Sequence, residues 1–274
     1  MKNRFSLPSV LAATVIAFGA CMICAAAEPD AALKAAVADS GRTATFVARD
    51  PARHPAEELA VFGIAPKMTV VELWPGGGYW TEILAPYLHK GGGTYYAAVN
   101  SPGDAEEDKG VERWRARMAS EKDRLGTIHE TALGAGHTAI APPGSADMVL
   151  TFRNLHNWMD GGFADEALAA CFTALKPGGI LGIEEHRGRN DKPQDPKAKD
   201  GYVRQDYTIA LAKKAGFVLV GASEINANPK DTKDWVDGVW TLPPSLSQKD
   251  KDREKYLAIG EADNFVLKFQ KPTH

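Results

Sequence analysis

Cysteine is scarce in this chain of 274 residues. Of the three cysteines, Cys21 and Cys24 lie in an apolar segment near the N-terminus, and Cys171 is alone in the rest of the chain. Cys171 falls on the apolar face of an expected helix, where a buried packing role is the usual one. We therefore expect neither an intramolecular disulfide nor a reactive thiol.

An excess of positive charge is also lacking. The chain has 32 Lys and Arg against 35 Asp and Glu, a net charge of -3 at pH 7, and no basic stripe. These features argue against nucleic acid as a partner. There is no internal repeat and no Gly-x-Ser-x-Gly motif, which argues against a serine hydrolase. At 44% hydrophobic and 24% charged residues, the composition is that of an ordinary globular domain.

The N-terminus has the pattern of a secretory signal peptide. Lys2 and Arg4 precede an apolar run over residues 7–27 that ends in three alanines. We expect cleavage after Ala27; an uncleaved anchor, or lipid attachment at Cys21, are the alternatives. All three place the protein outside the cytoplasm, so we expect a periplasmic or secreted protein with no stable membrane span once the leader is removed.

Apolar strand patterns alternate with helical patterns after the leader, which predicts an α/β fold with a doubly wound, mostly parallel sheet. We expect one domain over residues 28–274, with an N-terminal helical cap over 28–66 and an insertion over 226–256. The last strand lacks a clean crossover helix and could return antiparallel at the sheet edge. Expected strands are 69–73, 94–99, 128–133, 147–152, 180–185, 218–225 and 265–270; expected helices are 31–37, 56–62, 81–88, 111–125, 164–175 and 207–215.

A glycine-rich turn joins the first strand to the helix over 81–88. It reads Trp74-Pro75-Gly76-Gly77-Gly78-Tyr79 and follows Glu72 in the strand. Glycine lets the backbone approach a ligand, and the helix N-terminus favours negative charge, so the turn indicates a nucleotide-like cofactor. NAD-type binding is a weaker alternative because the third glycine of that fingerprint is missing. A tight turn with no ligand is another alternative.

Polar residues follow two further strands, where ligands of parallel sheets bind. Residues 153–158 read Arg-Asn-Leu-His-Asn-Trp, and Glu184-Glu185-His186 end the fifth strand. Strand alternation should turn Glu184 and His186 to one side and Glu185 to the other. His156 and His186 are candidates for acid–base chemistry. A metal site formed by both histidines and an acid is conceivable, but no spacing motif supports it, so we expect none.

Four other features have two interpretations each. Residues 49–55 form either a segment that closes over the ligand or, as we favour, a charged surface turn. Residues 190–200 form a solvated loop or a lid. Trp158 flanks the ligand or packs under a helix, and Trp235 and Trp240 line the substrate or form the core of the insertion.

Several short sequence motifs together give the chain a resemblance to the class I S-adenosylmethionine-dependent methyltransferases. More narrowly, the chain resembles an exported bacterial group of predicted methyltransferases. The resemblance runs from Thr43 to Pro272. It rests on the runs 71–79 and 153–158, Leu-Lys-Pro-Gly-Gly at 175–179, His186-Arg187 and Gly238-Val239-Trp240. It implies a seven-stranded sheet with the last strand inserted antiparallel, and S-adenosylmethionine over the glycine turn.

The resemblance also implies roles for individual residues, in a reaction that methylates a small-molecule acceptor. The chain departs from the family pattern at two positions. Trp74 stands where the family usually has the first glycine of the turn. Asn100 stands where the family has an acidic residue at the end of the second strand, and Asp104 could substitute for that acid. These departures favour the alternative, a non-catalytic protein that binds another small ligand. The cofactor-binding candidates are Glu72, Trp74, Pro75, Gly76, Gly77, Gly78, Tyr79, Asn100, Arg153 and Asn154; the catalytic candidates are His156 and His186.

Overall fold

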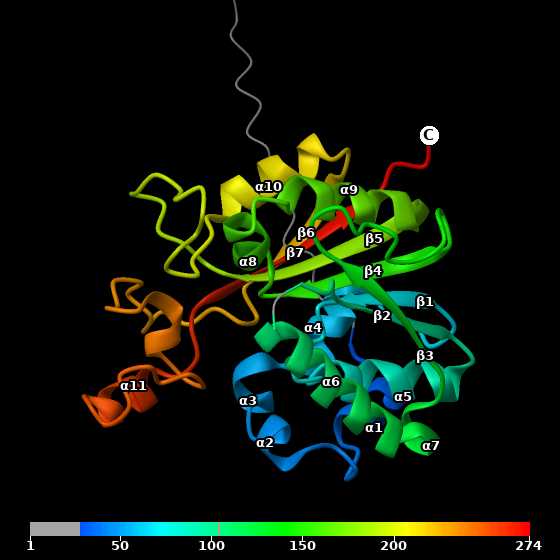
Figure 1. Cartoon of the computed structure of the whole chain (residues 1–274), viewed down its shortest axis with the longest axis horizontal. Helices are drawn as coiled ribbons and strands as arrows, with labels where there is room; N and C mark the ends of the chain where they lie inside the picture. The colour runs from blue at the N-terminus through cyan, green and yellow to red at the C-terminus, as the bar shows by residue number, and fades with distance from the viewer. Residues whose placement is uncertain (1–27, 104) are drawn as a thin grey trace, which may run out of the picture.

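A computed structural model describes residues 28–103 and 105–274. The leader, with its cleavage and lipidation sites, and Asp104 lie outside the described residues. A seven-stranded sheet has the order β3-β2-β1-β4-β5-β7-β6 (Figure 1). The strands are β1 (Thr69–Leu73), β2 (Thr94–Asn100), β3 (Ile128–Leu133), β4 (Ala146–Phe152), β5 (Leu175–His186), β6 (Val218–Ser223) and β7 (Asn264–Gln270).

The sheet is parallel from β3 through β5, and β7 runs antiparallel to both of its neighbours. This confirms the predicted doubly wound, mostly parallel α/β fold. The last strand does not lie at the sheet edge, however. It is inserted between β5 and β6, as the family resemblance implies, so that the edge strand is β6.

Helices cover both faces of the sheet, and Figure 1 shows the two layers above and below it. The apolar face of α8 (Leu155–Asp160), α9 (Ala164–Ala174) and α10 (Gln205–Lys214) packs on one side. On the other side lie α1 (Ala31–Val37), α4 (Pro55–Phe62), α5 (Thr81–Gly91), α6 (Ala105–Ser120) and α7 (Lys122–Leu125). Because β1 is buried between the layers, Val70 joins one core and Val71 the other, which explains its unbroken apolar run.

Three local expectations are corrected. The helix expected over 111–125 is two helices, α6 and α7, and α6 begins earlier. The strand expected over 180–185 begins earlier, at Leu175, directly after α9 ends at Ala174, so the Pro-Gly-Gly run at 177–179 lies within β5. Short helix α8 follows β4, where no helix was predicted. Gly216 follows the end of α10 with φ +101°, a conformation that glycine adopts readily.

The N-terminal segment and the insertion lie at the carboxyl end of the sheet. The first supplies α2 (Ala44–Val47) and α3 (Asp50–Arg53); the second supplies a 3₁₀ turn, η1 (Gly238–Thr241), and α11 (Arg253–Ile259). The insertion has its own small core, which includes Val239, Leu242 and Tyr256. Among the described residues, no helix has the length and apolar character needed to span a membrane.

Gly182 in β5 gives a test of core packing. A Cβ atom at this position would lie 2.6 Å from Leu150 Cδ2 and 2.7 Å from Phe62 Cδ1. We expect Gly182→Ala to lower the free energy of unfolding by about 1–3 kcal/mol through overpacking. The matched control is Gly110→Ala in α6, where the nearest atom is 3.9 Å away; helix propensity should raise stability there by up to about 1 kcal/mol. Urea unfolding measures both, and equal effects of the two substitutions would contradict the packing.

Candidate functional site

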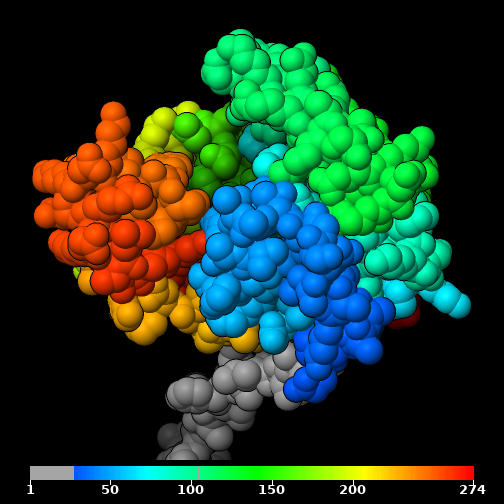
Figure 2. Space-filling view, turned by 90° about the horizontal axis from the view of Figure 1, so that it is seen from below, coloured from blue at the N-terminus to red at the C-terminus, as the bar shows by residue number. Residues whose placement is uncertain are grey.

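A cavity of about 380 Å³ opens at the carboxyl ends of β1, β4 and β5. Its walls also include the N-terminal segment and the insertion, and Figure 2 shows a hollow bordered by the blue and orange segments. Strand order reverses between β1 and β4, and ligands of open α/β sheets bind at such a switch point. The lining residues used below are Arg49, Arg53, Glu72, Trp74, Gly76, Arg153, His156, His186, Trp240 and Glu261.

The glycine turn forms the floor of the cavity. Gly76 and Gly78 have φ of +56° and +89°, and the Gly78 amide donates to the Pro75 carbonyl at 2.8 Å. Trp74 also has a positive φ, +48°, a backbone conformation that a glycine at this position would adopt at little cost. Its indole Nε1 donates to the Leu133 carbonyl at 2.9 Å. The Trp74 ring therefore fills space beside β3 and does not cover the turn.

Glu72 lies buried behind the turn. Its carboxylate accepts hydrogen bonds from Thr81 Oγ1 at 3.0 Å and from the Tyr95 hydroxyl. Burial raises the pKa of Glu72 to about 7, although both hydrogen bonds act in the opposite direction. The residue is therefore a carboxyl group that ionises near neutral pH and gains from a nearby cation.

Three arginines converge on one carboxylate in the cavity wall. Arg49 binds Glu261 through Nε at 2.6 Å and Nη2 at 2.8 Å, Arg53 Nε lies at 3.2 Å, and Arg153 Nη1 at 3.6 Å. Burial favours the neutral acid, but the Arg49 hydrogen bonds and the charges of Arg53 and Arg153 outweigh it and lower the pKa of Glu261 to about 2. One carboxylate does not balance three guanidinium groups, so the wall favours an anion.

Two further carboxyl groups lie beneath Arg153. Glu184 is 3.8 Å from Arg153 Nε, and the Asn226 amide donates to Glu58 at 2.7 Å and to Glu184 at 3.1 Å. Burial, and then the charge of Glu184, raise the pKa of Glu58 well above its ordinary value. Glu58 is therefore neutral, and Glu184 is the carboxyl group of this pair that forms an ion pair with Arg153.

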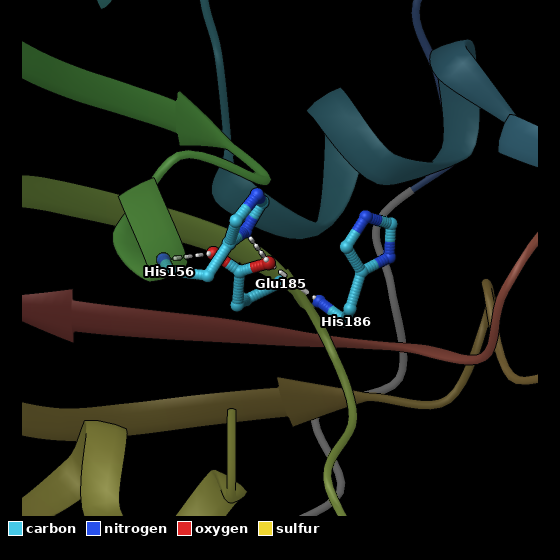
Figure 3. A group of neighbouring side chains, drawn as sticks. All are labelled: His156, Glu185 and His186. Carbon is cyan, nitrogen blue, oxygen red and sulfur yellow. Dashed lines mark hydrogen bonds and ion pairs between the residues drawn. The ribbon is translucent and has the colours of Figure 1, made fainter. Parts of the chain in front are cut away.

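The predicted histidines come together at the far wall of the cavity (Figure 3). His156 Nδ1 lies 2.9 Å from Glu185 Oε1, and the backbone amides of His156 and His186 donate to the same carboxylate at 3.1 and 2.8 Å. The two imidazole centroids are 5.5 Å apart. His186 Nδ1 lies 2.7 Å from Asn264 Oδ1. Burial and the neighbouring His156 lower the pKa of His186 well below its usual value, so this ring is neutral.

A second, smaller cavity of about 130 Å³ shares Pro75 and Gly76 with the first. It is lined by Asn100, at the end of β2, and by Glu107 from α6. The Asn100 amide donates to Glu107 Oε2 at 3.1 Å. Glu107 thus supplies a carboxyl group beside the end of β2.

Most of the sequence-predicted residues line the main cavity. Gly78 does not, and a Cβ atom there would meet Arg117 and Trp114 of α6, whereas Asn100 belongs to the second cavity. Asn154 lines the main cavity, and its amide also donates to the Leu73 carbonyl at 3.0 Å. The other predicted residues that line it are Glu72, Trp74, Pro75, Gly76, Gly77, Tyr79, Arg153, His156 and His186.

Four residues that line the two cavities were not predicted as site residues: Arg49, Arg53, Glu107 and Glu261. The favoured surface turn over 49–55 is instead a wall of the cavity. The only sequence signal for Glu107 is an acidic first helical turn after the second strand. Trp158 is fully buried and packs against Trp74, with ring centroids 6.2 Å apart. Trp235 packs inside the insertion against Tyr256, whereas Trp240 reaches the cavity.

Comparison with known proteins gives a fold but no close relative. No protein-family model and no curated protein matches the chain. Solved structures do match. One is a methyltransferase dependent on S-adenosylmethionine from Aquifex aeolicus, with TM-score 0.55 and 15% identity, covering 81% of this chain and 92% of the other. Another is the [4+2]-cyclase SpnF, with TM-score 0.54 and 16% identity, covering 88% and 92%.

A third similar structure is phosphoethanolamine N-methyltransferase 2 from Haemonchus contortus in complex with S-adenosyl-L-methionine. Its TM-score is 0.55 at 15% identity, covering 88% of this chain and 60% of the other. The fold is therefore that of the class I S-adenosylmethionine-dependent methyltransferases. SpnF carries a different activity in its name, which illustrates that the fold alone does not determine the reaction.

The raised pKa of Glu72 predicts a pH effect on stability. An ordinary value is 4.5, so between pH 4.5 and 7 the folded protein holds a proton that the unfolded chain has released. Stability should fall as pH rises through this window, by about 3 kcal/mol from this group. Glu72→Gln should lack that part of the decline, as urea unfolding at pH 5 and pH 8 would show. Exposed Glu112→Gln is the control, and a decline in Glu72→Gln equal to that of the unaltered protein would contradict the assignment.

Proposed function

We propose that this protein transfers the methyl group of S-adenosylmethionine to a small-molecule acceptor. The observation that carries the proposal is the cavity at the β1/β4 switch point. The glycine turn forms its floor, Glu72 lies behind it, and the arginines form its wall. The volume of about 380 Å³ lies within the usual range for small-molecule sites.

The charges in the cavity suit the amino-acid end of the cofactor, which has one ammonium and one carboxylate. Glu72 offers a buried carboxylate to the ammonium group. Arg153 makes ion pairs at 3.6 and 3.8 Å but no side-chain hydrogen bond to any described residue, so its donors are available to a ligand carboxylate. Arg53, in the same wall, adds a second positive charge. A bidentate contact from an arginine to a carboxylate is a strong one.

The second cavity suits the nucleoside end. It adjoins the first across Pro75 and Gly76, so a ligand extended over the turn reaches both. Ribose hydroxyls are hydrogen-bond donors, and the Glu107 carboxylate and the Asn100 amide oxygen accept. Glu107 then takes the role that the family assigns to an acid at the end of the second strand.

The acceptor belongs near the histidines and Trp240. Methyl transfer is a direct displacement at an activated sulfonium, and the protein mainly aligns the two partners. His156, held by Glu185, is placed to take the proton that a hydroxyl, amine or thiol acceptor loses. Trp240 lies edge-on to His156, with ring centroids 6.0 Å apart, and offers an apolar surface to the acceptor.

One observation favours a second function, the binding of another small ligand or a different reaction. Trp74 occupies a backbone position with φ +48°, which glycine adopts readily, and its indole lies against Phe163 and Trp158 at the edge of the site. This fills space that a glycine leaves open. The [4+2]-cyclase SpnF has a similar fold, which supports this second function.

We also propose that the protein works outside the cytoplasm, in the periplasm or as a secreted protein. The support is the sequence pattern of residues 1–27, with its basic start, apolar run and terminal alanines. Mass determination of the N-terminus of protein from the cell envelope tests this; a mature chain that begins at Glu28 is expected.

Calorimetric titration with S-adenosylmethionine tests the cofactor site. We expect Glu107→Gln to weaken binding by about 10-fold, because a hydrogen bond to a charged group contributes roughly 1.5 kcal/mol or more. The control is Glu106→Gln, one residue earlier in α6, which pairs with Lys109 at 2.7 Å and does not line either cavity. No binding by the unaltered protein at millimolar cofactor would refute the proposal and favour the second function.

A further inference from the structure

Three side chains at the cavity wall, called here the histidine cluster, have donor atoms that lie close together: His156, Glu185 and His186. His156, Glu185 and His186 each offer one donor atom, and the three atoms lie within 4.8 Å of one another. His156 lies in the first turn of α8, which follows β4, and the other two residues end β5, so the ends of two neighbouring strands position the group. In Figure 3 the two rings stand side by side, each with a nitrogen at its outer end on the same side.

The donor set has the chemistry of a metal site. Two imidazole nitrogens and one carboxylate oxygen are ligands that Zn²⁺ and Fe²⁺ bind in proteins. The distance of 2.9 Å between His156 Nδ1 and Glu185 Oε1 is close to the roughly 3.3 Å between two ligands on one Zn²⁺ with bonds of about 2.0–2.1 Å. An ion would replace the hydrogen bond between these two atoms, and the third donor atom, within 4.8 Å, would move closer to complete the site.

The surrounding hydrogen bonds orient the donors as metal sites require. Asn264 Oδ1 can only accept, so His186 Nδ1 carries a proton and its Nε2 keeps a free lone pair. The amides of His156 and His186 hold the Glu185 carboxylate from two sides. Such outer contacts fix ring orientation and tautomer in known metal sites.

The nearby charges do not exclude a cation. The charges of Arg153 and Arg53 act on His186, and Glu184 and Glu261 pair with these two arginines. Glu185 supplies the carboxyl group of the cluster itself. Both histidines line the cavity, so a bound ion faces it and has a position open to water or to a ligand atom.

We propose that His156, Glu185 and His186 bind a divalent transition-metal ion of the Zn²⁺ type at the wall of the cavity. Binding itself is independent of the proposed function; the consequence for catalysis rests on it. An acceptor hydroxyl or thiol on the ion loses its proton to water more readily. Its oxygen or sulfur then forms the bond to the methyl carbon while the bond from methyl to sulfonium breaks, which leaves S-adenosylhomocysteine. With the ion bound, His156 is a ligand and the ion activates the acceptor.

Zinc titration tests the site directly. The full-length sequence is expressed, and the purified protein is stripped with a chelator and titrated with ZnCl₂ in the absence of cofactor. We expect saturation at one Zn²⁺ per chain, and at least about 10-fold weaker binding in His186→Ala and in Glu185→Gln. The control is His137→Ala, an exposed histidine after β3, which should bind as the unaltered protein does.

Two further measurements guard against misfolded variants. Circular dichroism reports whether each variant folds. In addition, Asn264→Ala removes only the side-chain contact that orients His186, and we expect it to lower the affinity for zinc about 10-fold. Co²⁺ in place of Zn²⁺ should give a visible absorption band that His186→Ala lacks. Zinc binding that is absent at millimolar ZnCl₂, or is unchanged in both His186→Ala and Glu185→Gln, would overturn the proposal. Intact zinc binding without cofactor binding would refute only the proposed function.

Discussion

The reversal of strand order between β1 and β4 is the constraint on which the site depends. From β1 the chain proceeds to β2 and β3 on one side, and then crosses to β4 and β5 on the other. The connections diverge at this point and leave a crevice at the carboxyl ends of the strands. The glycine turn after β1 and residues 153–158 after β4 therefore face each other across one cavity, although about 80 residues separate them in sequence.

Charge pairing closes this crevice. Arg49 and Arg53, before the first strand, meet Glu261, which follows the insertion, and Arg153 after β4 joins them. The N-terminal cap and the insertion are thus held together over the site by one carboxylate. Breaking such a buried network by removing one partner leaves an uncompensated charge, which is costly. The same network leaves a surplus of positive charge in the wall, so the contacts that close the cavity also prepare it for an anionic group.

Local patterns in the sequence were sufficient to predict the strands, most helices and the glycine turn, because apolar periodicity and glycine report on neighbours in the chain. The family resemblance added the inserted β7. Contacts between distant residues were not predictable in this way: Arg49 and Glu261 are 212 positions apart, and neither belongs to a motif. Likewise, Glu107 lies on a helix face that only its docking beside Asn100 turns toward the site. His156 and His186 were predicted because each lies at or soon after the carboxyl end of a strand.

In the proposed function, the two cavities that share Pro75 and Gly76 together hold the cofactor from end to end. A crystal structure of the protein with S-adenosylhomocysteine would test this placement. We expect electron density that crosses Gly76, with the ligand carboxylate at Arg53 and Arg153 and the ribose at Asn100 and Glu107. Density for the ligand elsewhere on the molecule, or a cavity that holds only solvent at saturating ligand, would contradict it.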